Sequence, residues 1–169
     1  CSFCDLWEHH EHMPLDKLLV ILDDARRIGT KTLVITGGEP LLHPEVFTVV
    51  REAKKRGLTV NITTNGTLVE RHWDEVVACG VDSLSFSLDG LSETHDEIRG
   101  RKGAFNQTLL ALRKVSRETD IHCNVYFVAT SHNVGELWDV YQLAKEEAAG
   151  FDFWPVNDAP EMYITSIAD

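Results

Sequence analysis

Two cysteines open the chain three positions apart, as Cys1 and Cys4. Thiolates at this spacing can hold one metal centre from a single tight loop. The pair suits a zinc ion, an iron–sulfur cluster or a redox disulfide. Because so short a pattern occurs in many unrelated proteins, its meaning depends on the residues that follow it.

Three polar motifs follow, each at the end of a predicted strand: Gly37-Gly38-Glu39-Pro40, Thr64-Asn65-Gly66 and Ser87-Leu88-Asp89-Gly90. In parallel α/β folds, ligand sites form at the carboxyl ends of the strands. The glycines let a ligand approach the main chain, and Glu39 adds a hydrogen-bond acceptor. Each motif alone could be a simple strand-to-helix turn. Together with the cysteine loop, the three motifs predict the rim of one site.

Strands alternating with helices must position these motifs. The sequence predicts strands at residues 31–36, 58–63, 82–88, 121–129 and 151–156. It predicts helices at residues 14–29, 44–57, 68–79, 92–100, 105–118 and 134–149, with Ser92 as a possible cap. This order with short connections indicates βα units and a parallel sheet. A sixth strand is expected immediately before Cys1, so the chain reads as a piece that begins inside a motif.

The predicted strands alternate between apolar and polar side chains. Ser83, Ser85 and Ser87 alternate with Leu84 and Phe86, and residues 60–63 and 122–127 follow the same pattern. Side chains on a strand point to opposite faces with period two. One face therefore suits packing against helices, and the other needs water or a polar ligand. This favours a barrel or half-barrel with a polar lumen over an open sheet with one wet face.

Composition limits the class of protein. The 169 residues suit one soluble globular domain, with 43% apolar residues and a formal net charge of −11. This charge argues against nucleic acid as a partner, and no apolar run is long enough to span a membrane. Four cysteines in a chain of this size favour a reducing cytoplasm. We expect a core domain at residues 1–156 and an irregular tail, or the start of a further segment, at 157–169.

These motifs resemble those of the radical S-adenosylmethionine (radical SAM) superfamily. The matching segments are Cys1-Ser2-Phe3-Cys4 (the last two cysteines of a CxxxCxxC motif), Thr36 to Pro40, Thr63 to Gly66 and Phe86 to Gly90. The resemblance runs from Cys1 to about Val156 and implies a partial (βα)6 barrel that lacks its first strand. Residues 95–105 are similar to the SPASM-type subgroup, many of whose members modify peptides or proteins.

The resemblance also implies a reaction. Three thiolates would hold a 4Fe–4S cluster, and SAM would chelate the open iron. One electron, from a donor such as flavodoxin or ferredoxin, would cleave SAM to give a 5′-deoxyadenosyl radical. This radical would take a hydrogen atom from a substrate that is either a peptide or protein or a small molecule.

Roles transfer by resemblance to individual residues. Cys1 and Cys4 would be cluster ligands, and Phe3 would lie against the adenine. The SAM amino group would meet Gly37, Gly38, Glu39 and Pro40. Ser87 would contact the SAM carboxylate or ribose, with Asp89 as a weaker candidate. The other cofactor-site residues would be Thr64 and Asn124, both projecting into the lumen, and Asn65.

The third cluster ligand is expected four residues before Cys1. Cys79 and Cys123 do not replace it, because the pattern places them as buried structural thiols. Three alternatives remain from the sequence. The chain could be a non-catalytic metal-binding module with half a zinc site, a barrel enzyme without a cluster that binds phosphate at its glycine turns, or a degenerate family member.

Overall fold

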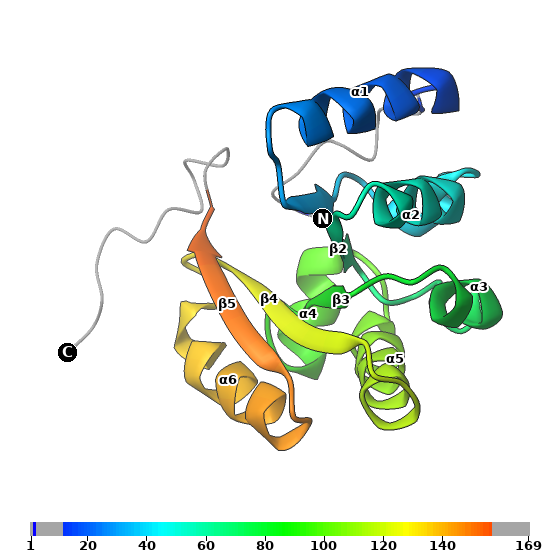
Figure 1. The fold of residues 1–169 in the computed structure, drawn as a ribbon. Helices are drawn as coiled ribbons and strands as arrows, with labels where there is room; N and C mark the ends of the chain where they lie inside the picture. Colours follow the sequence, from blue (N-terminus) through cyan, green and yellow to red (C-terminus); the bar gives the residue numbers. More distant parts are fainter. Residues whose placement is uncertain (1, 3–11, 157–169) are drawn as a thin grey trace.

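The computed structural model describes Ser2 and residues 12–156, and its centre is a sheet of five parallel strands (Figure 1). The strands are β1 (Thr32–Ile35), β2 (Thr59–Thr64), β3 (Ser83–Ser87), β4 (His122–Ala129) and β5 (Gly150–Pro155). They pair in the order in which they follow along the chain. The sheet curls into a half-barrel, which confirms the predicted α/β partial barrel. The predicted tail at 157–169 lies outside the described residues.

Helices connect the strands on one side of the sheet (Figure 1). They are α1 (Leu15–Arg27), α2 (Val46–Lys55), α3 (Trp73–Ala78), α4 (Ser92–Arg99), α5 (Ala104–Glu118) and α6 (Leu137–Glu146). Two short 3-10 helices, η2 (Pro40–Leu42) and η3 (Val134–Glu136), precede α2 and α6. None of the helices between residues 12 and 156 combines the length and the apolarity that crossing a bilayer requires.

Two helix starts differ from the sequence-based prediction. Helix α3 begins at Trp73 and not at Leu68, because the chain after Gly66 first makes turns, one of which brings the Val69 amide to the Gly66 carbonyl. Ser92 is the first residue of α4 and not its cap, because Leu91 occupies the N-cap position and provides no side-chain hydrogen bond. The carboxylate of Glu136 accepts from the Leu91 amide at 2.7 Å instead, so a distant side chain supplies an acceptor at the start of α4.

The helix-facing side of the sheet forms the core. Its central side chains are at most 1% exposed, and they are Val60, Ile62, Leu84, Phe86, Val125 and Phe127. The strand register places Ile62 beside Leu84, and Phe86 beside Val125. Helices α2, α5 and α6 pack on this face. Burial of this apolar surface is the main stabilising contribution to the sheet.

The opposite face carries the predicted polar lumen. Asn61, Ser83 and Ser85 lie together on β2 and β3, and the Asn61 amide donates to both serine hydroxyls at 2.7 and 3.1 Å. These side chains therefore satisfy part of one another's hydrogen-bonding capacity within the sheet. The alternation seen in the sequence is confirmed as a division between a packed face and a polar face.

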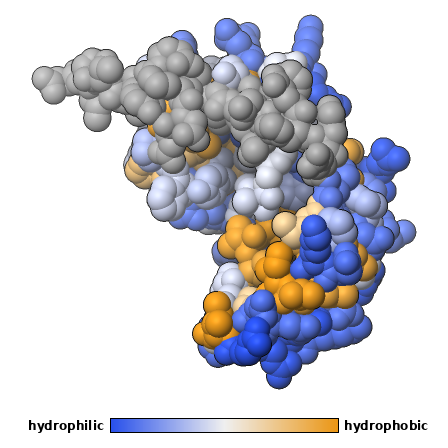
Figure 2. All heavy atoms as spheres, turned by 90° about the horizontal axis from the view of Figure 1, so that it is seen from above, coloured by the Kyte–Doolittle hydropathy of each residue, from blue (hydrophilic) through white to orange (hydrophobic). Residues whose placement is uncertain are grey.

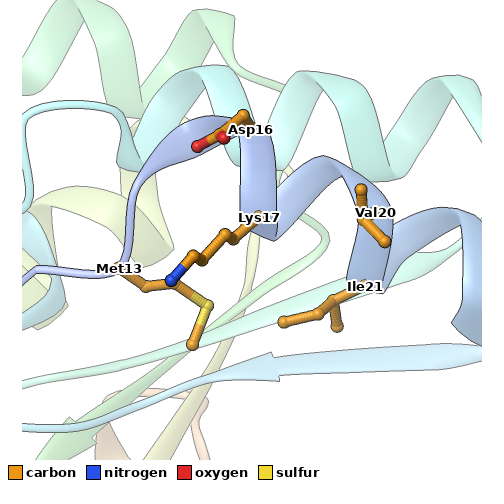
Figure 3. A pocket seen from close by; sticks show the side chains of 5 residues that line it. All are labelled: Met13, Asp16, Lys17, Val20 and Ile21. Atoms are coloured by element: carbon orange, nitrogen blue, oxygen red, sulfur yellow. The ribbon is translucent and has the colours of Figure 1, made fainter.

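Helix α1 leaves apolar side chains on the surface. Val20 is 60% exposed and Ile21 is 48% exposed, whereas Leu22 is buried against the core. Figure 2 views the molecule from above and shows apolar side chains gathered in a patch beside hydrophilic surface. A shallow pocket of about 420 Å³ lies along α1 and is lined by Met13, Asp16, Lys17, Val20 and Ile21 (Figure 3).

Candidate cofactor site at the strand ends

Glu39 joins the ends of β1 and β2. Its Oε1 accepts hydrogen bonds from the Thr64 hydroxyl at 2.8 Å and from the Leu41 amide at 3.1 Å. Its Oε2 accepts from the Asn65 amide at 2.7 Å. A carboxylate oxygen can accept two hydrogen bonds, so Oε2 retains capacity for a donor from a ligand. Burial raises the pKa of Glu39, and the hydrogen bonds together with the charge of Arg99 oppose this rise.

The glycine pair before Glu39 leaves the main chain open. Gly37 and Gly38 are both exposed. Gly37 has a φ of 147°, a conformation that strongly favours glycine. Space around the position of a Gly37 side chain is empty. The amide and carbonyl groups of this turn can therefore be reached directly by a ligand, as the sequence predicted. Pro40, by contrast, is buried as the first residue of η2.

Thr64 occupies the opposite face from the one predicted. It follows Val60 and Ile62 in the alternation of β2, whereas Asn61 and Thr63 face the lumen. The side chain is 1% exposed, and its hydroxyl donates to Glu39 and accepts from the Gly66 amide at 3.0 Å. Projection of Thr64 into the lumen is thus wrong. Its role in this structure is to hold Glu39.

Asn65 organises its own turn. Its side-chain oxygen accepts from the Thr67 amide at 2.9 Å and from the Thr67 hydroxyl at 2.7 Å. Its carbonyl oxygen accepts from the Thr108 hydroxyl on α5 at 2.6 Å. Because its amide donates to Glu39, this one residue links the Gly37–Pro40 loop, the end of β2 and α5.

The side chain of Asp89 is turned inward. Its carboxylate is fully buried, forms an ion pair with Arg99 and accepts from the Val128 amide at 2.9 Å. Its carbonyl oxygen accepts from the side chain of Asn133 at 2.9 Å. Burial does not support the direct contact with SAM that the sequence suggested as a weaker possibility. Asp89 instead positions Arg99, to which the sequence assigned no role.

His95 forms a hydrogen bond with the main chain of Asp89. Its Nδ1 accepts from the Asp89 amide at 3.1 Å, and its side chain is 1% exposed. Burial and, next, the charge of Arg99 lower the pKa of His95 to about 4. The imidazole is therefore neutral near pH 7, with its proton on Nε2. The sequence contained no signal for this role, because it depends on how α4 folds back onto the end of β3.

One contact places the start of the chain at this edge of the sheet. The Ser2 amide donates to the carbonyl oxygen of Ile98, next to Arg99, at 2.8 Å. The roles predicted for Cys1, Phe3 and Cys4 fall on residues outside the described part of the chain. Cys79 and Cys123 are buried, as predicted. Burial raises the pKa of both thiols, that of Cys123 to about 11, which disfavours the thiolate that metal binding needs.

Ser87 and Asn124 both lie on the lumenal side. Ser87 is partly exposed at the end of β3, beside Tyr126 in the register. The Asn124 amide donates to the Asp152 carboxylate at 2.8 Å. The sequence analysis missed Asp152, although the alternation of residues 151–154 could have revealed it. The α1 pocket in Figure 3 contains none of the predicted site residues.

The described residues at the strand ends fit SAM. Glu39 offers an acceptor to an amino group, and Ser87 offers a hydroxyl. The open turn at Gly37 offers main-chain groups, and Ser2 lies at the same edge. These groups complement an amino acid with an ammonium and a carboxylate.

Comparison with known proteins agrees with this geometry. The AdoMet-dependent heme synthase of Methanosarcina barkeri is 38% identical over 136 residues, which are 79% of this chain and 39% of the synthase. A tungsten-containing aldehyde ferredoxin oxidoreductase cofactor-modifying protein of Pyrococcus furiosus is 41% identical over 149 residues, which are 81% of this chain and 42% of that protein. The chain thus spans about two fifths of the length of these relatives.

A solved structure shows the same fold. Streptococcus suis SuiB bound to the precursor peptide SuiA superposes with a TM-score of 0.81 at 19% sequence identity, covering 100% of this chain and 39% of SuiB. The sequence profile of the Radical SAM superfamily matches residues 1–144. From the polar strand ends, the half-barrel and this match, we conclude that the chain belongs to the radical SAM superfamily.

Proposed function

We propose that the chain forms the cofactor-binding core of an enzyme that reductively cleaves SAM at a 4Fe–4S cluster and abstracts a hydrogen atom from a substrate. Cys1, Cys4 and a cysteine upstream of them would hold the cluster. When bound, the cluster and SAM supply the electron and the 5′-deoxyadenosyl radical. A flavodoxin or ferredoxin would provide the electron.

The hydrogen-bond network of Glu39 carries this proposal. It fixes the open Gly37–Gly38 turn against the end of β2, so the acceptor and the main-chain groups face a ligand from a rigid support. Glu39 would bind the ammonium group of SAM, and Ser87 would bind its carboxylate or ribose. Arg99 is held by Asp89 in an ion pair beside this edge.

A peptide or protein is the substrate class that we favour. The SuiB structure contains a precursor peptide, and another structural neighbour, anSMEcpe, was solved with AdoMet and a peptide, with a TM-score of 0.75. A tetrapyrrole is the second candidate, since the relative with 38% identity is named a heme synthase. The polar lumen, lined by Asn61, Ser83 and Ser85, suits the amide groups of a peptide.

The test uses the full-length protein, reconstituted with iron and sulfide without oxygen. With dithionite and SAM, it should form 5′-deoxyadenosine. Cys1→Ala and Cys4→Ala should abolish this product. The matched control Cys79→Ala should retain it, because that thiol is buried away from the strand ends. A colourless protein that binds zinc, or a cluster that never cleaves SAM, would contradict the proposal.

A further inference from the structure

The lumenal side of β4 and β5 carries a carboxylate with two aromatic residues at neighbouring positions. The register pairs Tyr126 with Asp152, and Val128 with Trp154. Asp152 and Trp154 lie two positions apart on β5, so both share a face with Tyr126. Trp154 is 57% exposed, which leaves its ring available to a ligand.

The Asp152 carboxylate is held in place by its neighbour on β4. Asn124 donates to Asp152 Oδ2 at 2.8 Å. A side chain at Gly150 would come within 2.4 Å of Asn124 Oδ1, so the glycine provides the space that Asn124 occupies. The position of the Asp152 carboxylate thus depends on Asn124, and that of Asn124 depends on the glycine at position 150. The remaining acceptor capacity of the Asp152 carboxylate is open to a ligand in the lumen.

The charged side chains on this face have one sign. Among the lumenal positions of the described strands, Asp152 is the one carboxylate, and none is lysine or arginine. The one histidine among them, His122, lies at the opposite end of β4 from the cofactor site. Burial, and then the charge of Asp152, raise the pKa of Tyr126, so its phenol stays protonated and neutral. An ammonium or guanidinium group is the ligand that a carboxylate flanked by aromatic rings recognises.

We propose that Asp152, Tyr126 and Trp154 bind a cationic group of the substrate, such as the side chain of lysine or arginine in a peptide. This assignment rests on the proposed function and narrows its substrate class. A polycarboxylate substrate would meet repulsion from Asp152 on this face. The shared chemistry is cation binding, and the sulfonium group of SAM is a second possible source of that cation.

The test measures binding of a small cation to the full-length, cluster-loaded protein labelled with 5-fluorotryptophan. The Trp154 fluorine signal is assigned with Trp154→Phe. The probe is Nα-acetyl-lysine methylamide, and its matched control is the norleucine analogue, which lacks the ammonium group. We expect a saturable shift of the Trp154 signal with the lysine probe and a much smaller shift with norleucine.

Two variants identify the carboxylate. Asp152→Asn should weaken binding of the lysine probe by up to about fivefold, the upper end of the range for an exposed charge pair. Asp139→Asn, an exposed aspartate on α6, should leave it unchanged. Equal shifts with both probes, or an unchanged affinity in Asp152→Asn, would overturn the proposal.

Competition with SAM distinguishes a substrate cation from the sulfonium group. If SAM displaces the lysine probe but S-adenosylhomocysteine does not, and Asp152→Asn weakens only SAM, the cation is the sulfonium and the substrate assignment fails. Formation of 5′-deoxyadenosine is measured on the same samples. If the lysine probe binds but no 5′-deoxyadenosine forms, the cation site stands and the proposed function is rejected. If 5′-deoxyadenosine forms but the probe does not bind, only the cation site is rejected.

Discussion

Asp89 and Arg99 form an ion pair that joins the end of β3 to the last turn of α4. Ile98, the neighbour of Arg99, accepts a hydrogen bond from the Ser2 amide. Two contacts, joined by the peptide bond between Ile98 and Arg99, therefore link the buried carboxylate to Ser2. Through this link, the last turn of α4 is connected both to the end of β3 and to Ser2.

Replacing Asp89 should destabilise the fold strongly. Asp89→Asn leaves the guanidinium of Arg99, whose side chain is 15% exposed, without the charge of this carboxylate. Removing one partner of a buried pair costs about 3 kcal/mol or more of unfolding free energy. Urea denaturation measures this loss. Asp152→Asn is the control, because that carboxylate is exposed, and it should cost less than about 0.5 kcal/mol. A loss below about 1 kcal/mol in Asp89→Asn would show that the pair is not structural.

Glu39→Gln tests the connection between β1 and β2. A glutamine has one acceptor oxygen in place of two, so either the Leu41 or the Asn65 amide faces an NH2 group. A buried donor left without an acceptor costs about 1–3 kcal/mol. The unfolding free energy should fall by this amount, and S-adenosylhomocysteine should bind more weakly. Glu97→Gln, an exposed change on α4, should alter neither quantity. Wild-type stability in Glu39→Gln would contradict the network.

Stability should fall in mild acid because of His95. Its pKa is lowered from 6.5 to about 4 in the folded protein, so the unfolded chain binds the proton more readily. The contribution is complete above about pH 6.5 and is lost as the pH falls toward 4. The full difference corresponds to about 3 kcal/mol.

The variant His95→Asn keeps an acceptor for the Asp89 amide and cannot titrate. Its unfolding free energy should therefore depend less on pH between 6.5 and about 4 than that of the wild type. His132→Asn, at an exposed position, should retain the wild-type slope. Parallel curves for His95→Asn and wild type would show that His95 has an ordinary pKa.

Gly150→Ala tests the close approach of β4 and β5. The new methyl group would force Asn124 away and break its hydrogen bond to Asp152, at a cost of about 1 kcal/mol. Gly135→Ala is the matched control, since space around Gly135 is open. In an Asn124→Ala background, Gly150→Ala should cost almost nothing. The same cost in both backgrounds would reject the contact.

Local patterns in the sequence were sufficient to predict the sheet and its polar face. The alternation of Ser83, Ser85 and Ser87 with apolar residues predicted the polar lumen, because side-chain direction on a strand depends only on position. The same rule, applied one residue further along β2, places Thr64 on the helix-facing side. The prediction for Thr64 was thus wrong although the sequence contained the information to correct it.

Long-range partners were not predictable from these patterns. Glu39 meets Thr64 and Asn65, which lie 25 and 26 positions later, and the pairing depends on the parallel register of β1 and β2. Arg99 reaches Asp89 only because α4 folds back across the end of β3. The start of α3 was misplaced because the apolar spacing after Gly66 suits a helix, whereas turns occupy that stretch.

The contact between Gly150 and Asn124 also constrains how this part of the family can vary. A protein that keeps Asn at position 124 in this rotamer has no room for a side chain at position 150. A lineage that acquires even alanine at 150 must shorten or turn the residue at 124, and then the carboxylate at 152 loses its support. Substitutions at positions 124, 150 and 152 should therefore occur together during evolution. A change in substrate preference would then appear as a joint change of residues on β4 and β5.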